Sequence, residues 1–231
     1  MSIEVRPLKL TEKDLLRSVI DLGRRNSATL GFFPDGAFEE HAYRETILIA
    51  LSSGSFAGYV LYRLSNDRVS LTHLCVHEDF RGKGVTKLLV KAVRLRTEQY
   101  EGMGFKCRND YGIGEMWKKL GFYPRGEVVG RGKSQNPLTQ WYMDYGKADL
   151  FTVASTNLTT VVLDANVLFN LSNGVNIESA QCLVADWLVD EIDLAYTAEI
   201  FNEIERIEDL EKRKVQRSRL NAYISTAKVC R

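Results

Sequence analysis

The feature that most constrains the fold is a change of hydrophobic period after residue 76. Residues 68–76 alternate apolar and polar side chains, as a half-buried strand does. After a turn, residues 84–100 carry apolar side chains at the spacing of one helix face. The members of that face are Val85, Leu88, Leu89, Ala92 and Val93. A strand, a turn and an amphipathic helix therefore follow one another here.

The turn between this strand and this helix reads Arg81-Gly82-Lys83-Gly84-Val85-Thr86. Glycines let a backbone approach a ligand closely, and the first turn of a helix presents unpaired N–H groups at the positive end of the helix dipole. Such a turn suits a pyrophosphate. It is neither a P-loop nor the three-glycine dinucleotide motif. The alternative is an ordinary glycine-rich turn before a helix with a solvated charged face.

A basic stripe follows on the predicted helix. Lys87, Lys91 and Arg94 lie on its exposed face and are placed to meet a further phosphate.

The remaining pattern up to residue 150 predicts strands and helices in alternation. A helix over 11–26 begins at Thr11 as its N-cap and buries Leu15, Val19 and Leu22. Trp117 shares the apolar face of a later helix that ends at Gly121. The other predicted elements are strands at 3–8, 45–53, 56–65, 104–109, 127–130 and 139–145, a short helix at 37–43, and hairpin turns at 53–55 and at Asn66-Asp67.

Composition excludes several classes of protein. With 231 residues, 45% hydrophobic and 26% charged, the chain is neither disordered nor of low complexity. The net charge of +1 gives no argument for nucleic acid. Residues 1–150 hold 23 basic and 18 acidic side chains, whereas residues 151–231 hold 8 and 12, and this shift indicates two units.

Cysteine spacing and hydropathy indicate the compartment. The four cysteines, Cys75, Cys107, Cys182 and Cys230, match neither a zinc cluster nor a small disulfide scaffold. No run of about 18 apolar residues is present, so no membrane partner is expected. A reducing, cytoplasmic location is the prediction.

Residues 152–159 are small and polar, as in a linker. After them the pattern predicts a strand ending before Asp164, a helix over 179–190, a strand over 193–197 and a charged helix over 198–223. That order predicts a parallel βαβα unit. The 72 residues after Thr159 are few for an independent α/β domain, so the unit looks incomplete.

Together, these motifs resemble the GNAT superfamily of acetyltransferases over about residues 3–150. The loop matches the family pattern at Arg81 and Gly84, with Thr86 at the last position of the pattern. The preceding strand ends in Leu74-Cys75-Val76, and the later helix ends in Leu120-Gly121-Phe122, as in the family. The resemblance implies a GNAT domain over 1–151. Its α/β fold would be a splayed mixed, mostly antiparallel sheet flanked by helices. It also implies acetyl-CoA as cosubstrate, held by Leu74, Cys75, Val76, Arg81, Gly82, Lys83, Gly84, Val85, Thr86 and Lys87.

The chain departs from the family pattern at two functional positions. Thr86 replaces a glycine or alanine. Trp117 stands where many members carry a tyrosine that protonates the departing thiolate, and an indole N–H is no usable acid. Core packing is the predicted role of Trp117. The family's asparagine falls on Asp110, with Asn109 beside it.

Candidates for proton transfer are therefore His73 and Tyr111. A histidine titrates near neutral pH, so His73 on the strand or His77 after it could take a proton from an ammonium group. The pattern places His73 on one strand face with its apolar neighbours, so a packed histidine is the competing interpretation. Tyr111, or Tyr123, could replace the missing acid.

Residues 160–231 resemble the first half of a PIN domain. Asp164 matches the first acid of that family and Glu203 the second, with Thr197 ahead of it. The resemblance implies Mg²⁺ or Mn²⁺ only if further acids complete the site. The alternatives are a helix N-cap for Asp164 and a solvated charge for Glu203. The chain is then a fragment of a longer protein, or the unit is degenerate.

The sequence thus predicts an acetyl-CoA-dependent N-acyltransferase in which an amine attacks the thioester directly. Two alternatives remain open. One is a catalytically degenerate GNAT domain that binds CoA or a partner. The other is part of a PIN-type metal-dependent ribonuclease. The acceptor is an amine on a small molecule or a protein, and nucleic acid is expected only through the PIN-like unit.

Overall fold

The computed structural model describes residues 2–65, 68–131, 134–146, 159–173, 182–190, 192–197, 199–224 and 228–230. The chain divides into two compact units. The first comprises Met1–Val128 and Leu138–Val153, and the second Val129–Pro137 and Ala154–Arg231. Most of the predicted linker, residues 152–158, and the predicted turn at Asn66-Asp67 lie outside the described residues, and Thr159 already belongs to a strand.

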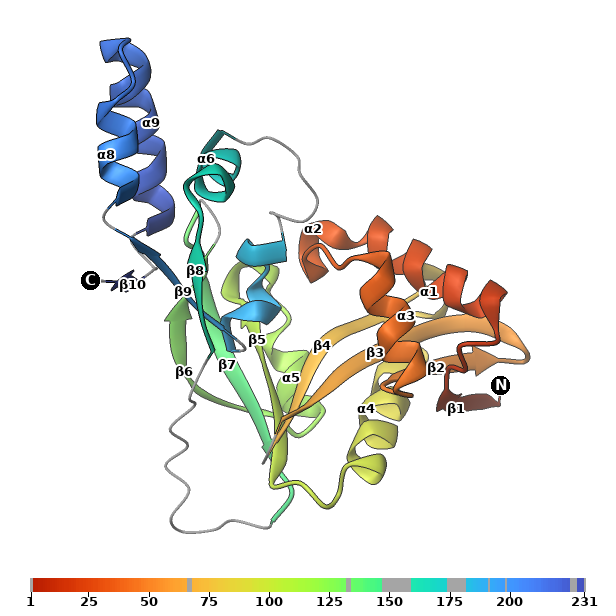
Figure 1. Ribbon diagram of the computed structural model, residues 1–231. Helices are drawn as coiled ribbons and strands as arrows, with labels where there is room; N and C mark the ends of the chain where they lie inside the picture. Colours follow the sequence, from red (N-terminus) through yellow and green to blue (C-terminus); the bar gives the residue numbers. More distant parts are fainter. Residues whose placement is uncertain are drawn as a thin grey trace. The chain divides into compact units, whose positions relative to one another are not determined.

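The first unit is built on a seven-stranded sheet in the order β1-β2-β3-β4-β5-β7-β6 (Figure 1). Its strands are β1 (Ile3–Pro7), β2 (Ile47–Ser52), β3 (Ser55–Ser65), β4 (Arg68–Val76), β5 (Gly102–Arg108), β6 (Tyr123–Val129) and β7 (Pro137–Asp144). The pairs β1–β2, β2–β3, β3–β4 and β5–β7 are antiparallel, whereas β4 and β5 are parallel. The sheet is therefore mixed and mostly antiparallel, as the sequence predicts.

Helices cover both faces of this sheet (Figure 1). They are α1 (Lys13–Arg25), α2 (Ser27–Leu30) and α3 (Asp35–Tyr43) on one face, α4 (Val85–Arg96) and α5 (Gly114–Lys119) on the other, and the 3₁₀ turns η1 (Glu78–Phe80) and η2 (Asn109–Tyr111). Helix α4 buries Val85, Leu89, Val90 and Val93 against the sheet. Leu88, expected in this face, is 37% exposed because it lies on the flank of the buried stripe.

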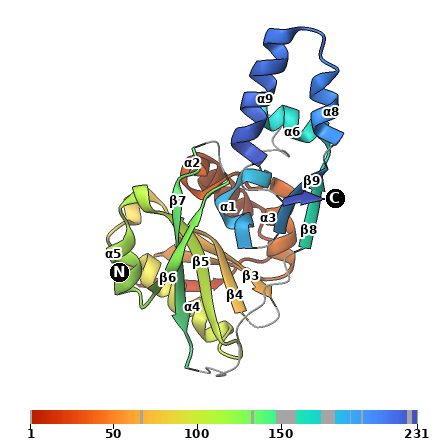
Figure 2. The ribbon, with the colours of Figure 1, turned by 90° about the vertical axis from the view of Figure 1, so that its left-hand side faces the viewer.

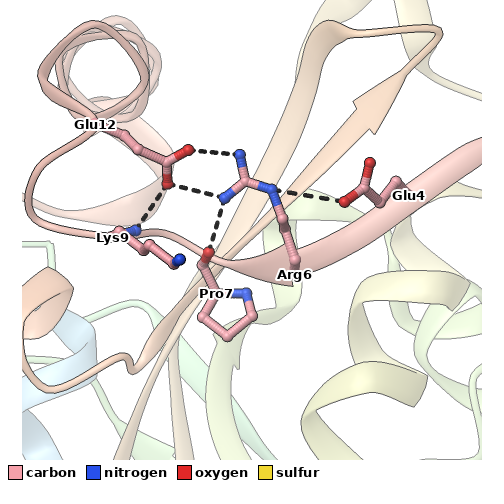
Figure 3. A network of polar contacts seen from close by, with 5 residues as sticks. All are labelled: Glu4, Arg6, Pro7, Lys9 and Glu12. Atoms are coloured by element: carbon pink, nitrogen blue, oxygen red, sulfur yellow. Dashed lines mark hydrogen bonds and ion pairs between the residues drawn. The ribbon is translucent and has the colours of Figure 1, made fainter.

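A polar network fixes the start of α1 (Figure 3). The guanidinium of Arg6 on β1 donates to both carboxylate oxygens of Glu12, at 2.8 and 2.6 Å, and Lys9 donates its backbone N–H to Glu12 at 3.0 Å. The N-cap of α1 is Glu12, so the prediction of Thr11 is wrong by one residue. The bidentate pair with Arg6 and the bond from the Lys9 N–H hold the Glu12 side chain beside the helix start. Leu16, rather than Leu15, is buried beside Val19.

The second unit contains a parallel three-stranded sheet in the order β10-β9-β8. Its elements are β8 (Thr159–Leu163), α6 (Ala165–Asn173), η3 (Cys182–Val184), η4 (Asp186–Asp190), β9 (Ile192–Thr197), α8 (Glu199–Glu205), α9 (Leu210–Ile224) and β10 (Lys228–Cys230). Helices α8 and α9 lie side by side (Figure 2). The parallel order confirms the α/β pattern predicted here, whereas the PIN resemblance stays a prediction.

Two helix predictions in this unit are wrong in detail. The helix expected over 179–190 consists of two 3₁₀ turns in its described part. There the Arg131 guanidinium donates a hydrogen bond to the Leu188 carbonyl oxygen at 3.3 Å. The charged helix expected over 198–223 is broken, because Asp209 accepts the Glu211 and Lys212 N–H groups at 3.0 and 3.1 Å and so caps a new helix, α9.

Among the described residues, no helix is both long enough and apolar enough to cross a bilayer.

The network at α1 predicts a pH-dependent loss of stability in Glu12→Gln. Hydrogen bonding to Arg6 lowers the pKa of Glu12 from its ordinary 4.5 to about 2. The carboxylate therefore stabilises the fold fully above about pH 4.5, and this contribution is lost as the pH falls toward 2. Both side chains are partly solvated, so we expect a cost of about 1 kcal/mol at neutral pH in urea unfolding.

Glu4→Gln is the matched control, because Glu4 also faces Arg6 but at 3.6 Å and with a side chain that is 65% exposed. We expect its cost to stay within about 0.5 kcal/mol. Equal costs for the two variants would contradict the assigned role of the Glu12 network.

Candidate functional site

Strands β4 and β5 pair only where they begin. Val69 lies opposite Met103 and Ser70 opposite Gly104, and no further pair joins the described residues of the two strands. Beyond these positions β4 continues along β3 and β5 continues along β7. The two parallel strands therefore diverge toward their carboxyl ends and open the sheet between them.

A β-bulge in β4 lies at the start of this divergence. Leu61 of β3 faces His73, whereas the next residue, Tyr62, faces Leu71, so Thr72 is an extra residue in β4. A bulge bends its strand and exchanges the two faces beyond it. Leu71 accordingly packs in the core beneath α4, and His73 turns to the other face. The expectation that both share one face is wrong for this reason.

The bulge also decides which backbone groups of β4 face the opening. The Cys75 carbonyl oxygen points at β3 and lies 2.5 Å from the position that a Cβ would take on Gly58. The N–H and C=O groups of successive residues point to opposite edges of a strand. Because those of Cys75 point to β3, those of Leu74 and Val76 point toward the opening. The Val76 carbonyl there accepts a bond from Arg81 Nε at 3.3 Å. Cys75, which the resemblance included among the contacts, is directed away, and burial raises the pKa of its thiol to about 11.

The loop after β4 exposes backbone groups that no side chain covers at its two glycines. Gly82 and Gly84 adopt φ values of 74° and 78°, and a Cβ on either would meet no atom within 4 Å. Val85 anchors the loop because its side chain is buried in the core. Lys83 rests its ammonium 5.2 Å from the Phe80 ring centroid. The left-handed backbone is one that glycine adopts without strain.

Helix α4 leaves its first N–H groups available. Gly84 is its N-cap, and the first bond of the helix runs from Leu88 N to the Gly84 carbonyl at 3.2 Å. The amides of Val85, Thr86 and Lys87 therefore have no acceptor within the helix. Open space before the glycines, free amides and the positive end of the dipole fit a phosphate group.

A groove of about 820 Å³ lies along α4 and begins at Lys87. The cations Lys87, Lys91 and Arg94 line it from α4, and Lys119 lines it from the end of α5. Within the described part of the chain, none of these lysines forms an ion pair. Arg94 lies 5.6 Å from the ring centroid of Tyr145, which also lines the groove. The basic stripe was predicted from helical spacing, but Lys119 was not, because its approach depends on the tertiary fold.

His73 lies in an aromatic cluster and not in the opening. It is 2% exposed, its Nδ1 is 2.9 Å from the Tyr59 hydroxyl, and its ring contacts Phe33 and Phe38. Burial, and then the charge of Arg63, lowers its pKa to about 3. A histidine held neutral in this way is a weak base, which favours the packed interpretation.

Trp117 is a core residue, as predicted. Its ring centroid is 4.2 Å from that of Phe105 and 5.7 Å from that of Phe122. Its Nε1 is buried and has no hydrogen-bond partner among the described residues. The indole packs in the core beneath α5 and does not donate a proton into the opening between β4 and β5.

The two tyrosine candidates lie in different places. Tyr111 directs its hydroxyl to the carbonyl oxygens of Ala28 and Thr29, at 3.4 and 3.3 Å. Tyr123 is 41% exposed on β6, with its hydroxyl 3.3 Å from Arg125. No local pattern indicates the Tyr111 contact, because it joins residues more than 80 positions apart.

In the described part of the second unit, the structure brings no further metal ligand to the acidic pair. Asp164 Oδ1 accepts the Asn166 N–H at 2.8 Å and caps α6, which is the alternative stated above. Glu203 is half-buried on α8. Among the described residues, no group of three or more histidine, cysteine or acidic side chains could hold a metal ion. The predicted Mg²⁺ or Mn²⁺ ligands therefore gain no support.

Comparisons with known proteins agree with this geometry. The family model described as an acetyltransferase (GNAT) domain matches residues 32–132. Residues 32–132 are thus similar to a GNAT acetyltransferase domain, and the matched stretch includes the opening, the glycine loop and α4. The search of curated proteins found no match.

Solved structures share the fold. Ard1 from Thermoplasma volcanium is 16% identical with a TM-score of 0.52, and the match covers 62% of this chain and 98% of that one. The ribosomal-protein-S18-alanine N-acetyltransferase from Escherichia coli is 14% identical with a TM-score of 0.52, covering 65% and 98%. The protein yncA from Salmonella typhimurium, solved with its cofactor acetyl-CoA, is 13% identical with a TM-score of 0.54, covering 64% and 97%. At these identities the likeness concerns the fold.

The cluster around His73 predicts a loss of stability on mild acidification. The unfolded chain binds a proton at His73 near pH 6.5, whereas the folded chain resists it until about pH 3. The free energy of unfolding therefore falls as the pH drops below 6.5, by up to about 1.4 kcal/mol per pH unit from this residue. His41, with a pKa lowered by burial to about 4, adds to the slope.

The variant His73→Phe isolates this contribution, because His41 is unchanged in it. At pH 7.5 we expect His73→Phe to be less stable by about 1 kcal/mol, since the Tyr59 hydroxyl loses its partner. Below pH 6.5 the difference should shrink and then reverse in urea unfolding at stepped pH. A constant difference from pH 7.5 to 4.5 would show that His73 titrates normally.

Proposed function

We propose that this chain binds acetyl-CoA at the divergence of β4 and β5 and transfers the acetyl group to a primary amine. One observation carries the proposal: the opening lies directly before a glycine loop whose bare amides begin α4. A thioester arm in the opening would meet the backbone of Leu74 and Val76. The pyrophosphate would meet the amides of residues 82–87, in open space that suits it.

The matched family and the shared fold support this assignment. The Salmonella protein was solved with acetyl-CoA, and the Escherichia coli relative is by its name an N-acetyltransferase for an alanine of a ribosomal protein. An amine of either a protein or a small molecule is therefore the acceptor class that we propose. The +5 charge of residues 1–150 does not choose between them.

The reaction requires little of the protein beyond positioning the amine and the thioester. The amine nitrogen attacks the carbonyl carbon of the thioester, the carbon–sulfur bond breaks, and the proton released from nitrogen ends on the departing sulfur. Holding both reactants at the opening replaces a collision in solution by a reaction within one complex. Since His73 is held neutral in the core and Trp117 is packed, we propose that water carries this proton.

A second candidate is binding of acetyl-CoA without transfer. The position of Trp117 favours it, because a buried indole occupies the place of the family's acid. Release of free CoA thiol from acetyl-CoA in the presence of a panel of amines separates the two functions. Binding without release would select the second.

The first test is thermal unfolding of the full chain with acetyl-CoA in excess. At about 100 times the dissociation constant, a ligand of the folded state adds about 2.7 kcal/mol, which raises the melting temperature by several degrees. In Gly84→Val we expect this rise to vanish. The valine Cβ would fill the space before the amides, and at φ 78° it would also cost about 1–2 kcal/mol.

Gly54→Val is the matched control for backbone strain. Gly54 lies in the β2–β3 hairpin at φ 83°, again with no atom within 4 Å of its Cβ position. Both variants should melt earlier, but Gly54→Val should keep the full acetyl-CoA shift. If Gly84→Val keeps it as well, the loop does not hold the cofactor.

The groove along α4 predicts selectivity for the 3′-phosphate of CoA. We propose that Lys87, Lys91, Arg94 and Lys119 meet the adenosine end of CoA, since the groove starts where the glycine loop ends. Lys91→Glu should weaken CoA binding by about tenfold and dephospho-CoA binding by about threefold or less in calorimetry. Lys13→Glu on α1 makes the same change of charge on the other face, and equal effects of the two would remove the groove from the site.

A further inference from the structure

One side-chain contact joins the two arms of the divergence at their open ends. Tyr111 ends η2, directly after β5, and α2 packs against β4. The Tyr111 hydroxyl shares its one proton between the carbonyl oxygens of Ala28 and Thr29 in α2, at 3.4 and 3.3 Å. The contact therefore bridges from the β5 arm to the β4 arm, on the face that α1, α2 and α3 cover.

Neighbouring groups hold Tyr111 in this position. The Arg108 guanidinium lies 5.0 Å from its ring centroid and pairs with Asp110 through two bonds, of 3.0 and 2.5 Å. Asn109 donates to Glu127 at 2.8 Å and accepts from Thr139 at 2.5 Å, which fixes η2 to β6 and β7. These contacts together orient the Tyr111 ring on the turn after β5.

We propose that Tyr111 is a specificity-determining residue that admits slender acceptor amines and excludes bulky ones. The inference rests on the proposed function, which places the thioester between β4 and β5. An acceptor that enters from the side of α2 must pass the bridge. A narrow, unbranched amine passes beside it, whereas a wide one must break the bonds from Tyr111 to Ala28 and Thr29.

Two nucleophiles of different width test this on the full chain. Hydroxylamine and O-benzylhydroxylamine both attack thioesters without a catalytic base, so the readout is access to bound acetyl-CoA, measured as free CoA thiol. The bound thioester of the wild type should favour hydroxylamine over O-benzylhydroxylamine more strongly than free acetyl-CoA does. In Tyr111→Phe, which keeps the ring over Arg108, the rate with O-benzylhydroxylamine should rise by about tenfold while that with hydroxylamine stays unchanged.

Tyr123→Phe is the matched control, since it removes a hydroxyl on β6 outside the bridge and should leave both rates unchanged. An unchanged ratio in Tyr111→Phe would overturn the proposal. An equal loss with both nucleophiles, together with a shifted pH profile, would assign Tyr111 to proton donation instead and also overturn it. Failure of the proposed function is seen separately, as absence of an acetyl-CoA shift in thermal unfolding of the wild type.

Discussion

The structure of the first unit depends on the divergence of two parallel strands that share only two paired positions. Backbone N–H and C=O groups without a hydrogen-bond partner are costly. Such an opening therefore persists only if each of the two strands is hydrogen-bonded to another strand on its other edge. Strand β4 is held by β3, and β5 is held by β7. The bulge at Thr72 bends β4 away while it stays paired with β3, and it turns the backbone of Leu74 and Val76 toward the gap.

Helix α4, beside the opening, carries unfavourable charge–charge interactions that a purely structural domain would avoid. Lys87 and Lys91 are like charges one helical turn apart, which costs a few tenths of a kcal/mol. Lys87 also lies in the first turn of α4, where the helix dipole disfavours cations. Elsewhere in the described chain, cations such as Arg6 and Arg108 are paired with carboxylates. A surplus of positive charge beside free helix amides is what an anionic ligand would neutralise.

The sequence predicts the succession of strands and helices along the chain, the glycine loop and the basic stripe because each depends on local spacing. It does not predict the bulge, since Leu71, His73 and Cys75 alternate as in a regular strand, and only pairing with β3 shows the extra residue. The contact from Tyr111 is not predicted for another reason, because it joins segments that are far apart in the sequence through one hydroxyl. Asp164 shows that local capping can satisfy a residue for which a family resemblance suggests a metal.

The placement of the titratable groups bears on how a proton could leave the acceptor. Burial holds His73 neutral at physiological pH, and the nearest polar partner of its Nδ1 is the Tyr59 hydroxyl, whose pKa burial raises. That pair stabilises the aromatic cluster on the α1–α3 face and is unsuited to exchanging protons with solvent. Trp117 offers an N–H that is not acidic, and the Tyr111 hydroxyl already donates to carbonyl groups. Under the proposed function, a domain arranged in this way would accelerate transfer by orienting a free amine and a thioester, and its rate would follow the fraction of acceptor that solvent has already deprotonated.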